Sequence, residues 1–175
     1  MRYRRSDVAG GTYFFTVNLQ NRQNTLLVDH IDLLRTVFAK TKANHPFTID
    51  AIVVLPEHLH TIWTLPSDNA DFALRWRVIK AAFSRGLSSH NQLSTDQLRR
   101  REKGIWQRRY WEHLIRDEND YARHIDYIHY NPVKHGYVKR AADWPYSSIH
   151  RYIRSGDIDK DWGVSGDFSG SFGER

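Results

Sequence analysis

The sequence of 175 residues contains no cysteine. This absence excludes disulfide frameworks, zinc sites built from thiolates and cysteine nucleophiles. No apolar run approaches the roughly 18 residues of a membrane-spanning helix, so the sequence does not predict a membrane protein. The first residues, MRYRRSDVAGG, are charged and lack the apolar stretch of a signal peptide, and we therefore expect a cytoplasmic protein.

Basic and aromatic residues, in contrast, are abundant. Lys and Arg number 26 against 20 Asp and Glu, a formal net charge of +6, and aromatic residues make up 13% of the chain, including six tryptophans. A surface that combines cations with aromatic rings can neutralise phosphates and stack bases. A merely solvated basic surface is the alternative, so composition alone leaves nucleic-acid binding open.

The charge is distributed unevenly along the chain. The first 150 residues carry 22 basic and 15 acidic side chains, whereas the remainder carries 4 and 5 and holds five of the ten glycines. We therefore expect one folded domain over residues 1–153 and a flexible Gly- and Asp-rich tail over residues 154–175. Whether this acidic tail folds back over a phosphate-binding cleft and inhibits it, or has no such role, stays open at this point.

Hydrophobic periodicity predicts an α+β fold. In chain order we expect a strand at 12–19, a helix at 30–43, strands at 47–55 and 58–65, a helix at 72–87, a strand at 105–115, and a helix from Asp117, its N-cap, to Asn131, where Pro132 ends it. The order β-α-β-β-α-β is the ferredoxin-like, split βαβ plan, an antiparallel sheet with two helices on one face. The last helix is additional, and the uncovered face of the sheet is free to host a site.

Two histidines stand two residues apart in the motif Pro56-Glu57-His58-Leu59-His60. Side chains alternate along a strand, so His58 and His60 point to the same face, within reach of one cation. Imidazole is a common protein ligand of divalent metals. Two semi-exposed histidines on a solvated sheet face are the alternative.

The predicted helix after residue 117 contains a second candidate site. At about 100° per residue, its apolar stripe is formed by Tyr121, Ile125 and Ile128. Tyr127 lies outside this stripe, as an exposed nucleophile would, and Tyr130 falls on the opposite, solvent-facing side. Asn131, one turn after Tyr127, is placed to add a carbonyl oxygen to a metal site begun by the histidines. A surface tyrosine and a C-capping asparagine are the alternative.

Four stretches of the sequence carry a family pattern: GGTYFFTVNLQNR, VVLPEHLHTIWTLP, WQRRYWEHLIRDENDYARHIDYIHYNPVKHGYV and DWPYSSIHRY. Together they cover nearly all of residues 3–152. In these stretches the chain resembles the REP-associated tyrosine transposases, relatives of the insertion-sequence transposases that act on single strands, within the HUH endonucleases. The resemblance implies that residues 1–153 form an HUH transposase catalytic domain.

The resemblance also implies roles for individual residues. His58 and His60 are the paired histidines of the HUH motif, and Tyr127 is the single catalytic tyrosine. Asn131 stands where relatives supply the third ligand of a divalent metal ion, Mg²⁺ or Mn²⁺; insertion-sequence members have glutamine there. The segment 88–104 is longer than in other members, which bears on substrate preference rather than on the chemistry.

The implied reaction is cleavage of single-stranded DNA through a covalent intermediate. A phenol with an ordinary pKa near ~10 is a weak nucleophile at neutral pH, and the phosphodiester under attack is anionic. A divalent cation held by His58, His60 and Asn131 would polarise the phosphorus. Attack by Tyr127 would give a 5′-phosphotyrosine and a free 3′-OH, and a 3′-OH can later reseal the strand without ATP. His124, on the same helix face, is a candidate general base.

Three basic clusters are candidates for phosphate contacts. They lie in the N-terminal arm, on the helix predicted at 72–87, and around the strand predicted at 105–115: Arg2, Arg4 and Arg5; Arg75, Arg77, Lys80 and Arg85; Arg99, Arg100, Arg101, Lys103, Arg108 and Arg109. Tyr3, Trp106 and Tyr110 are candidates to stack unpaired bases, and Trp106 is equally a candidate for the hydrophobic core. The resemblance implies that the partner is a folded single-stranded DNA hairpin of the REP type, flanked by a tetranucleotide that the N-terminal arm helps to read. A monomer or a homodimer would bind it.

Rival functions belong to other classes. A non-catalytic DNA-binding protein derived from a transposase would have no need of His58, His60 and Tyr127 together. An HUH nickase of the replication or conjugation type is disfavoured by the short chain. A metal hydrolase that uses the histidines without Tyr127 would never form a covalent adduct with DNA.

Overall fold

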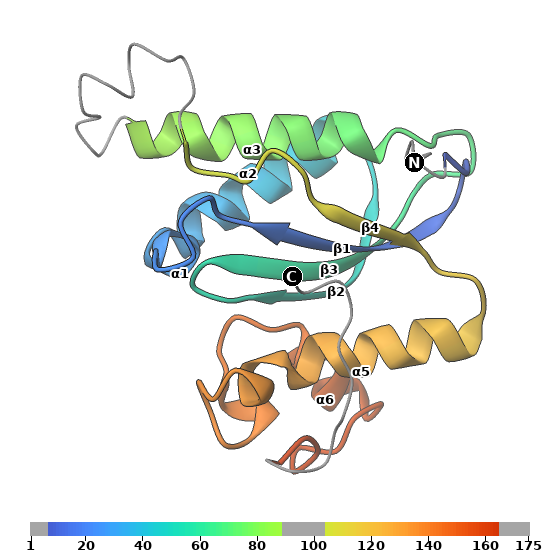
Figure 1. Ribbon diagram of the computed structural model, residues 1–175. Helices are drawn as coiled ribbons and strands as arrows, with labels where there is room; N and C mark the ends of the chain where they lie inside the picture. The colour runs from blue at the N-terminus through green and yellow to red at the C-terminus, as the bar shows by residue number, and fades with distance from the viewer. Residues whose placement is uncertain (1–6, 89–103, 165–175) are drawn as a thin grey trace, which may run out of the picture.

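The computed structural model describes residues 7–88 and 104–164, and in it one antiparallel sheet separates two layers of helices (Figure 1). The strands are β1 (Thr12–Asn18), β2 (Thr48–Val54), β3 (His58–Thr64) and β4 (Trp111–Leu114). The helices are α1 (Leu26–Asp29), α2 (Ile31–Asn44), α3 (Phe72–Ser88), α5 (Glu118–Lys134), the 3₁₀ turn η1 (Ala141–Asp143) and α6 (Ile149–Ser155).

The strand order β2-β3-β1-β4, with every neighbouring pair antiparallel, confirms the predicted ferredoxin-like plan. Helices α2 and α3 cover one face of the sheet, and α5 covers the other (Figure 1). The nucleophile candidate is therefore carried by the additional helix, on the face that the two helices of the basic plan leave free. Among the described residues, no helix has the length and apolar character needed to cross a bilayer.

The two central strands send alternate side chains to two different cores. Phe15 of β1 and Trp63 of β3 belong to the cluster under α2 and α3, where Trp63 stacks on Trp76 with ring centroids 4.2 Å apart. Phe14 and Ile62, their neighbours in the sequence, belong to the smaller cluster under α5. This period of two follows from the pleat of the strands, and it gives each face of the sheet its own set of side chains.

The register of the sheet fixes the histidines. Thr16 of β1 pairs with His60 of β3, and Asn18 pairs with His58. A two-residue turn at Pro56 and Glu57, closed by the backbone N–H of Leu55 donating to the carbonyl of His58 at 2.9 Å, precedes β3. Because β3 is a central strand, both histidines lie inside the sheet and not at its edge.

The strand predicted at 105–115 is shorter in the structure. Only Trp111–Leu114 form β4, whereas Trp106 makes an isolated bridge to Leu19. The segment between them is held by other partners, since the Lys80 Nζ donates to the Gln107 carbonyl at 3.0 Å and Trp106 packs against Phe83 of α3. Packing on α3 thus overrides the strand propensity of this segment.

The helix that begins after the N-cap Asp117 does not end at Asn131, as predicted, but includes Pro132 and runs to Lys134. Proline removes one N–H from the helix ladder, but the burial of its ring and of Val133 compensates for that loss. The end comes at Gly136, which has a φ of +74° and whose N–H donates to the Val133 carbonyl at 2.9 Å. Asn131 therefore has helical geometry.

The chain beyond α5 builds a third, small core. Tyr130 and Val133 pack there with Ala141 and Ile149, and the Trp162 ring lies 6.4 Å from that of Tyr130. Residues up to Val164 thus take part in the fold, with a bridge between Arg140 and Val164. The rest of the predicted tail, residues 165–175, lies outside the described residues, so whether the tail inhibits the site stays open.

Candidate active site

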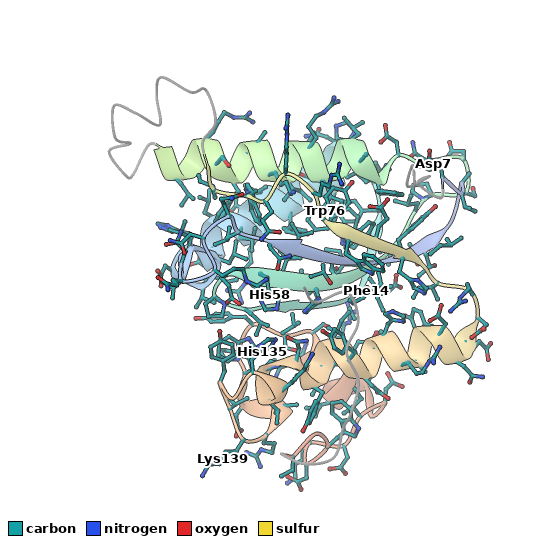
Figure 2. All side chains as sticks on the ribbon, in the orientation of Figure 1. Asp7, Phe14, His58, Trp76, His135 and Lys139 are labelled. Carbon is teal, nitrogen blue, oxygen red and sulfur yellow. The ribbon has the colours of Figure 1, made fainter. Side chains whose placement is uncertain are left out.

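His58 and His60 lie on the sheet face that α5 covers, with their ring centroids 4.9 Å apart and their planes at 83°. Both side chains are fully buried. Figure 2 shows His58 and Phe14 on this side of the sheet, whereas Trp76 lies on the side of α3. As the alternation of side chains along the strand predicted, the two imidazoles lie on the same face of the sheet. They are buried there, and not semi-exposed on a solvated face.

Each imidazole is held through its Nδ1 atom. His58 Nδ1 lies 2.8 Å from Glu57 Oε1, and His60 Nδ1 lies 2.8 Å from the Thr16 hydroxyl. Burial lowers the pKa of His58 against the opposing effect of the Glu57 carboxylate. For Glu57 itself, burial would raise the pKa, but the hydrogen bond with His58 and the nearby charges lower it. The pair is therefore a neutral imidazole beside an ionised carboxylate.

Helix α5 places a row of side chains over the histidines. The Tyr127 ring lies 5.2 Å from the His60 ring, and the His135 ring lies 5.2 Å from the His58 ring. Asn131, which is fully buried, lies one turn after Tyr127 and one turn before His135. Since these two contacts bracket it, Asn131 faces the histidine pair. The Lys134 Nζ donates to the Tyr127 hydroxyl at 3.4 Å.

Two expectations about the tyrosines on α5 are wrong. Tyr127 is only 1% exposed and packs with Phe14, Ile62 and Ile128 instead of lying outside the apolar stripe. Tyr130 does not face solvent, because the segment after α5 folds back over that side of the helix and buries it. Helical periodicity assumed one covered face, whereas α5 is covered by the sheet on one side and by η1 and Ile149 of α6 on another.

The residues present fit a divalent metal ion. His58 Nε2 is buried and has no hydrogen-bond partner. Because buried polar atoms are normally paired, this nitrogen fits the role of a metal ligand. Two imidazole nitrogens and an amide oxygen form a mixed donor set that suits a first-row ion such as Mn²⁺ better than Mg²⁺, which prefers oxygen.

A second group with metal-binding spacing lies at the beginning of α5, formed by His113 of β4 with Asp120 and His124 of α5. Its hydrogen bonds indicate a structural role, and we call these three residues and Arg116 the Asp120 hub. His113 Nε2 lies 2.8 Å from Asp120 Oδ2, and His124 Nδ1 lies 2.7 Å from the Asp120 carbonyl, so that this nitrogen carries the proton and is no ligand. The Arg116 side chain also contacts the carboxylate, at 3.5 Å. A cation would have to displace these donors.

His124, the candidate general base, belongs to this hub. It is 3% exposed, and its ring packs on Phe14 with centroids 4.7 Å apart. Phe14 also contacts Tyr127, at 6.0 Å between ring centroids. The two residues thus share a neighbour, and the role of His124 as a base stays a prediction.

The predicted DNA contacts of α3 lie on the other side of the sheet. A groove of about 1290 Å³ runs between α3 and residues 104–110, and we call it the α3 groove. Its lining includes the exposed Arg77, Arg85 and Arg108 and the half-buried Lys80, whose pKa burial lowers to about 8. The Lys80 Nζ lies 5.0 Å from the Tyr110 ring centroid, so cations and aromatic rings meet in this groove.

Arg75 does not decorate the exposed side of α3, contrary to expectation. It is 3% exposed, and its guanidinium donates to Asn69 Oδ1, to the Asp71 carbonyl and to the Pro46 carbonyl, each at 2.7 Å. Arg109 is exposed, near the groove. Seven of the basic candidates lie outside the described residues: Arg2, Arg4, Arg5, Arg99, Arg100, Arg101 and Lys103. The stacking candidate Tyr3 lies outside them as well.

Two known proteins are similar to this chain over nearly its whole length. The REP-associated tyrosine transposase of Escherichia coli K12 is 48% identical over 174 residues, which cover 99% of this chain and 96% of that protein. A Haemophilus influenzae protein given the same family name is 46% identical over 166 residues, 94% of either chain. The chain belongs to the REP-associated tyrosine transposases.

A solved structure agrees with this membership. It is a REP-associated tyrosine transposase bound to a REP hairpin, 48% identical, with a TM-score of 0.85 over all of this chain and 98% of that one. No model in a scan of protein families matches the chain. The resemblance to this transposase family, which four stretches of the sequence indicated, is thus confirmed.

Three residues of the candidate site could not be named from the sequence analysis. Glu57 and Thr16 hold the histidine rings, and Lys134 contacts the hydroxyl of Tyr127. Glu57 stands next to His58 in the sequence and was available as a signal. Thr16 becomes a neighbour of His60 only through the register of β1 and β3, and Lys134 becomes one of Tyr127 only because the helix continues past Pro132.

The Asp120 hub predicts how stability depends on pH. Burial would raise the pKa of this carboxyl, but its hydrogen bonds with His113 and Arg116 lower it to about 2. A carboxyl whose folded pKa lies below the ordinary ~3.9 stabilises the fold above about pH 4 and loses this contribution as the pH falls toward 2. Asp120→Asn should lower the free energy of unfolding at pH 7 by about 1–3 kcal/mol.

Urea unfolding at pH 7, 4 and 2.5 measures this effect. The difference between wild type and Asp120→Asn should shrink below pH 4, whereas Asp32→Asn, an exposed carboxyl on α2, should cost less than about 0.5 kcal/mol throughout. A difference for Asp120→Asn that is the same at all three pH values would contradict the low pKa.

Proposed function

We propose that the protein is a metal-dependent single-stranded DNA endonuclease and strand transferase that acts on REP-type hairpins through a 5′-phosphotyrosine. The observation that carries this proposal is the Tyr127 ring 5.2 Å from His60, beside two imidazoles whose centroids are 4.9 Å apart. A tyrosine that is a candidate nucleophile and two histidines that are candidate metal ligands, from two distant segments, thus lie side by side. Family membership supports the same reading.

The chemistry divides among the residues of the site. The Tyr127 oxygen would form a bond to phosphorus as the bond from phosphorus to the 3′-oxygen breaks, and the phenolic proton is balanced by the new 3′-OH. Lys134, whose Nζ lies 3.4 Å from that hydroxyl, would stabilise negative charge on the phenolate or on the phosphate. His58, His60 and Asn131 would hold a divalent cation, which supplies polarisation of the scissile phosphate when bound.

The burial of the site sets a condition on the reaction. Tyr127 is 1% exposed and Asn131 is fully buried, whereas Lys134 and His135 at the end of α5 are exposed. A DNA strand can reach the hydroxyl only after the groups that cover it move. The basic side chains at the exposed end of α5 suit an approaching phosphate.

A binding protein without catalysis is the main rival, and the hydrogen bonds of the site argue against it. A binding module gains nothing from an unpartnered His58 Nε2 in the interior, which costs roughly 1–3 kcal/mol of desolvation. Such a cost persists in a protein when the group has a use.

Removal of one oxygen tests the nucleophile. Tyr127→Phe should abolish both strand cleavage and the covalent protein–DNA adduct, while the affinity for a REP-type hairpin changes less than about threefold, because the ring and its packing remain. Denaturing gels with end-labelled hairpin DNA measure the adduct, and gel-shift titration measures the affinity.

Tyr130→Phe is the matched control for this variant. Tyr130 lies on the same helix, in the third core, and its replacement should leave the adduct in place. An adduct that survives Tyr127→Phe, or one that Tyr130→Phe removes, would assign the nucleophile elsewhere.

Removal of the cation tests the metal. EDTA should stop cleavage, and added Mn²⁺ should restore it in the wild type but not in His58→Ala, which lacks the buried ligand nitrogen. His150→Ala serves as control, because this histidine of α6 bonds the Trp144 carbonyl away from the site. Undiminished cutting in EDTA would refute the role of the metal.

The hairpin partner rests on the relative whose structure contains a REP hairpin and on the basic surfaces of this chain. The α3 groove offers exposed guanidiniums together with the rings of Trp106 and Tyr110. Phosphates would pair with the former and unpaired bases would stack on the latter. Because this groove lies across the sheet from Tyr127, binding and cleavage would be separable.

Salt dependence tests this separation. Replacing both Arg77 and Arg85 by alanine should weaken hairpin binding and reduce the slope of log affinity against log salt by about 2, one for each lost phosphate contact. Arg35→Ala with Arg154→Ala, two exposed arginines of α2 and α6, is the matched control. Equal slopes for the two double variants would exclude the α3 groove from the DNA contact.

A further inference from the structure

The buried Glu57 carboxylate is the centre of a small hydrogen-bond and ion-pair network beside the histidines. Its Oε1 lies 2.8 Å from His58 Nδ1 and 3.5 Å from a guanidinium nitrogen of Arg22. Its Oε2 accepts a hydrogen bond of 3.4 Å from the Tyr137 hydroxyl. Glu57 is 7% exposed. Three elements thus meet on one carboxylate: the turn before β3, the loop after β1 and the segment after α5.

This contact determines which nitrogen of His58 carries the proton. An ionised carboxylate only accepts hydrogen bonds, so Nδ1 must be the donor. The lone pair is then on Nε2, the buried atom that has no hydrogen-bond partner. The contact of His60 is less restrictive, because the Thr16 hydroxyl at 2.8 Å can either donate or accept. The two histidines therefore differ in how firmly their tautomers are fixed.

The other partners restrain the carboxylate itself. The backbone carbonyl of Glu57 accepts a hydrogen bond from the Leu19 N–H at 2.8 Å, which fixes the turn before β3 against the end of β1. Arg22, which precedes Glu57 in the sequence, contacts one carboxylate oxygen, and Tyr137, which follows it, contacts the other. A carboxylate held in this way cannot rotate freely, and it transmits that restraint to the His58 ring.

We propose that Glu57 is the positioning residue of this site: it holds His58 with its Nε2 lone pair directed at the cation, and Arg22 and Tyr137 hold Glu57. The proposal rests on the function proposed above for the cation. A carboxylate behind a ligand imidazole fixes the ring and makes it a stronger donor, and loss of such a partner costs about 10- to 100-fold in metal affinity. Glu57 is itself neither a proposed ligand nor the proposed nucleophile, and it acts through the ring of His58.

The tautomer can be read directly in the metal-free protein. Long-range ¹H–¹⁵N correlation spectra of EDTA-treated wild type should show His58 as the Nδ1–H form alone. In Glu57→Gln the amide can donate as well as accept, so the spectrum should show a mixture that includes the Nε2–H form. An unchanged His58 spectrum in Glu57→Gln would overturn the proposal.

Metal affinity is the second readout. Titration with Mn²⁺ alone should show a dissociation constant at least about tenfold higher in Glu57→Gln than in wild type. Glu112→Gln is the control: this glutamate of β4 is also buried, but it pairs in register with Phe15 on the other side of β1. It should leave both the His58 spectrum and the Mn²⁺ affinity unchanged.

A milder variant covers the case in which Glu57→Gln does not fold. Tyr137→Phe removes one hydrogen bond from an exposed ring and should weaken Mn²⁺ binding by about threefold, the usual value of such a bond. Equal Mn²⁺ affinity in both variants and wild type would overturn the proposal. If wild type itself bound no Mn²⁺, the proposed function would fail, and the metal-free spectrum would still decide the role of Glu57.

Discussion

The packing of α5 against the histidine-bearing face of the sheet is the constraint on which the site depends. This one contact brings Tyr127 to 5.2 Å from His60 and excludes water from both imidazoles. Without α5, the histidines would be solvated side chains on an open sheet, with ordinary affinity for protons. With α5, His58 is neutral in the interior, which is the state a metal ligand requires.

One face of the sheet carries the main hydrophobic core, and the other carries the candidate active site. Under α2 and α3 lies a large aromatic core in which Trp63 stacks on Trp76, and its burial accounts for most of the hydrophobic stabilisation. Under α5 the core is smaller, and polar groups such as His60 and Asn131 interrupt it. A fold with one strongly packed face can hold such groups in place on the other.

Much of this architecture could be predicted from the sequence, because its signals are local. Alternation placed His58 and His60 on one face, and helical spacing placed Asn131 one turn from Tyr127. What could not be predicted depends on contacts between distant segments. The burial of Tyr130 requires that the chain after α5 folds back, and the internal role of Arg75 requires a carbonyl from Pro46. The helix end was misplaced because Pro132 was taken as a stop, whereas burial of its ring lets the helix continue.

The central claim is that the Tyr127 hydroxyl becomes joined to a DNA 5′-phosphate beside the imidazole pair. The most direct measurement is peptide mapping by mass spectrometry after incubation of the wild-type protein with a single-stranded REP-type hairpin and Mn²⁺. The account predicts one modified peptide, with the nucleotide mass on Tyr127. Modification of any other residue, or cleaved DNA without any modified peptide, would contradict it.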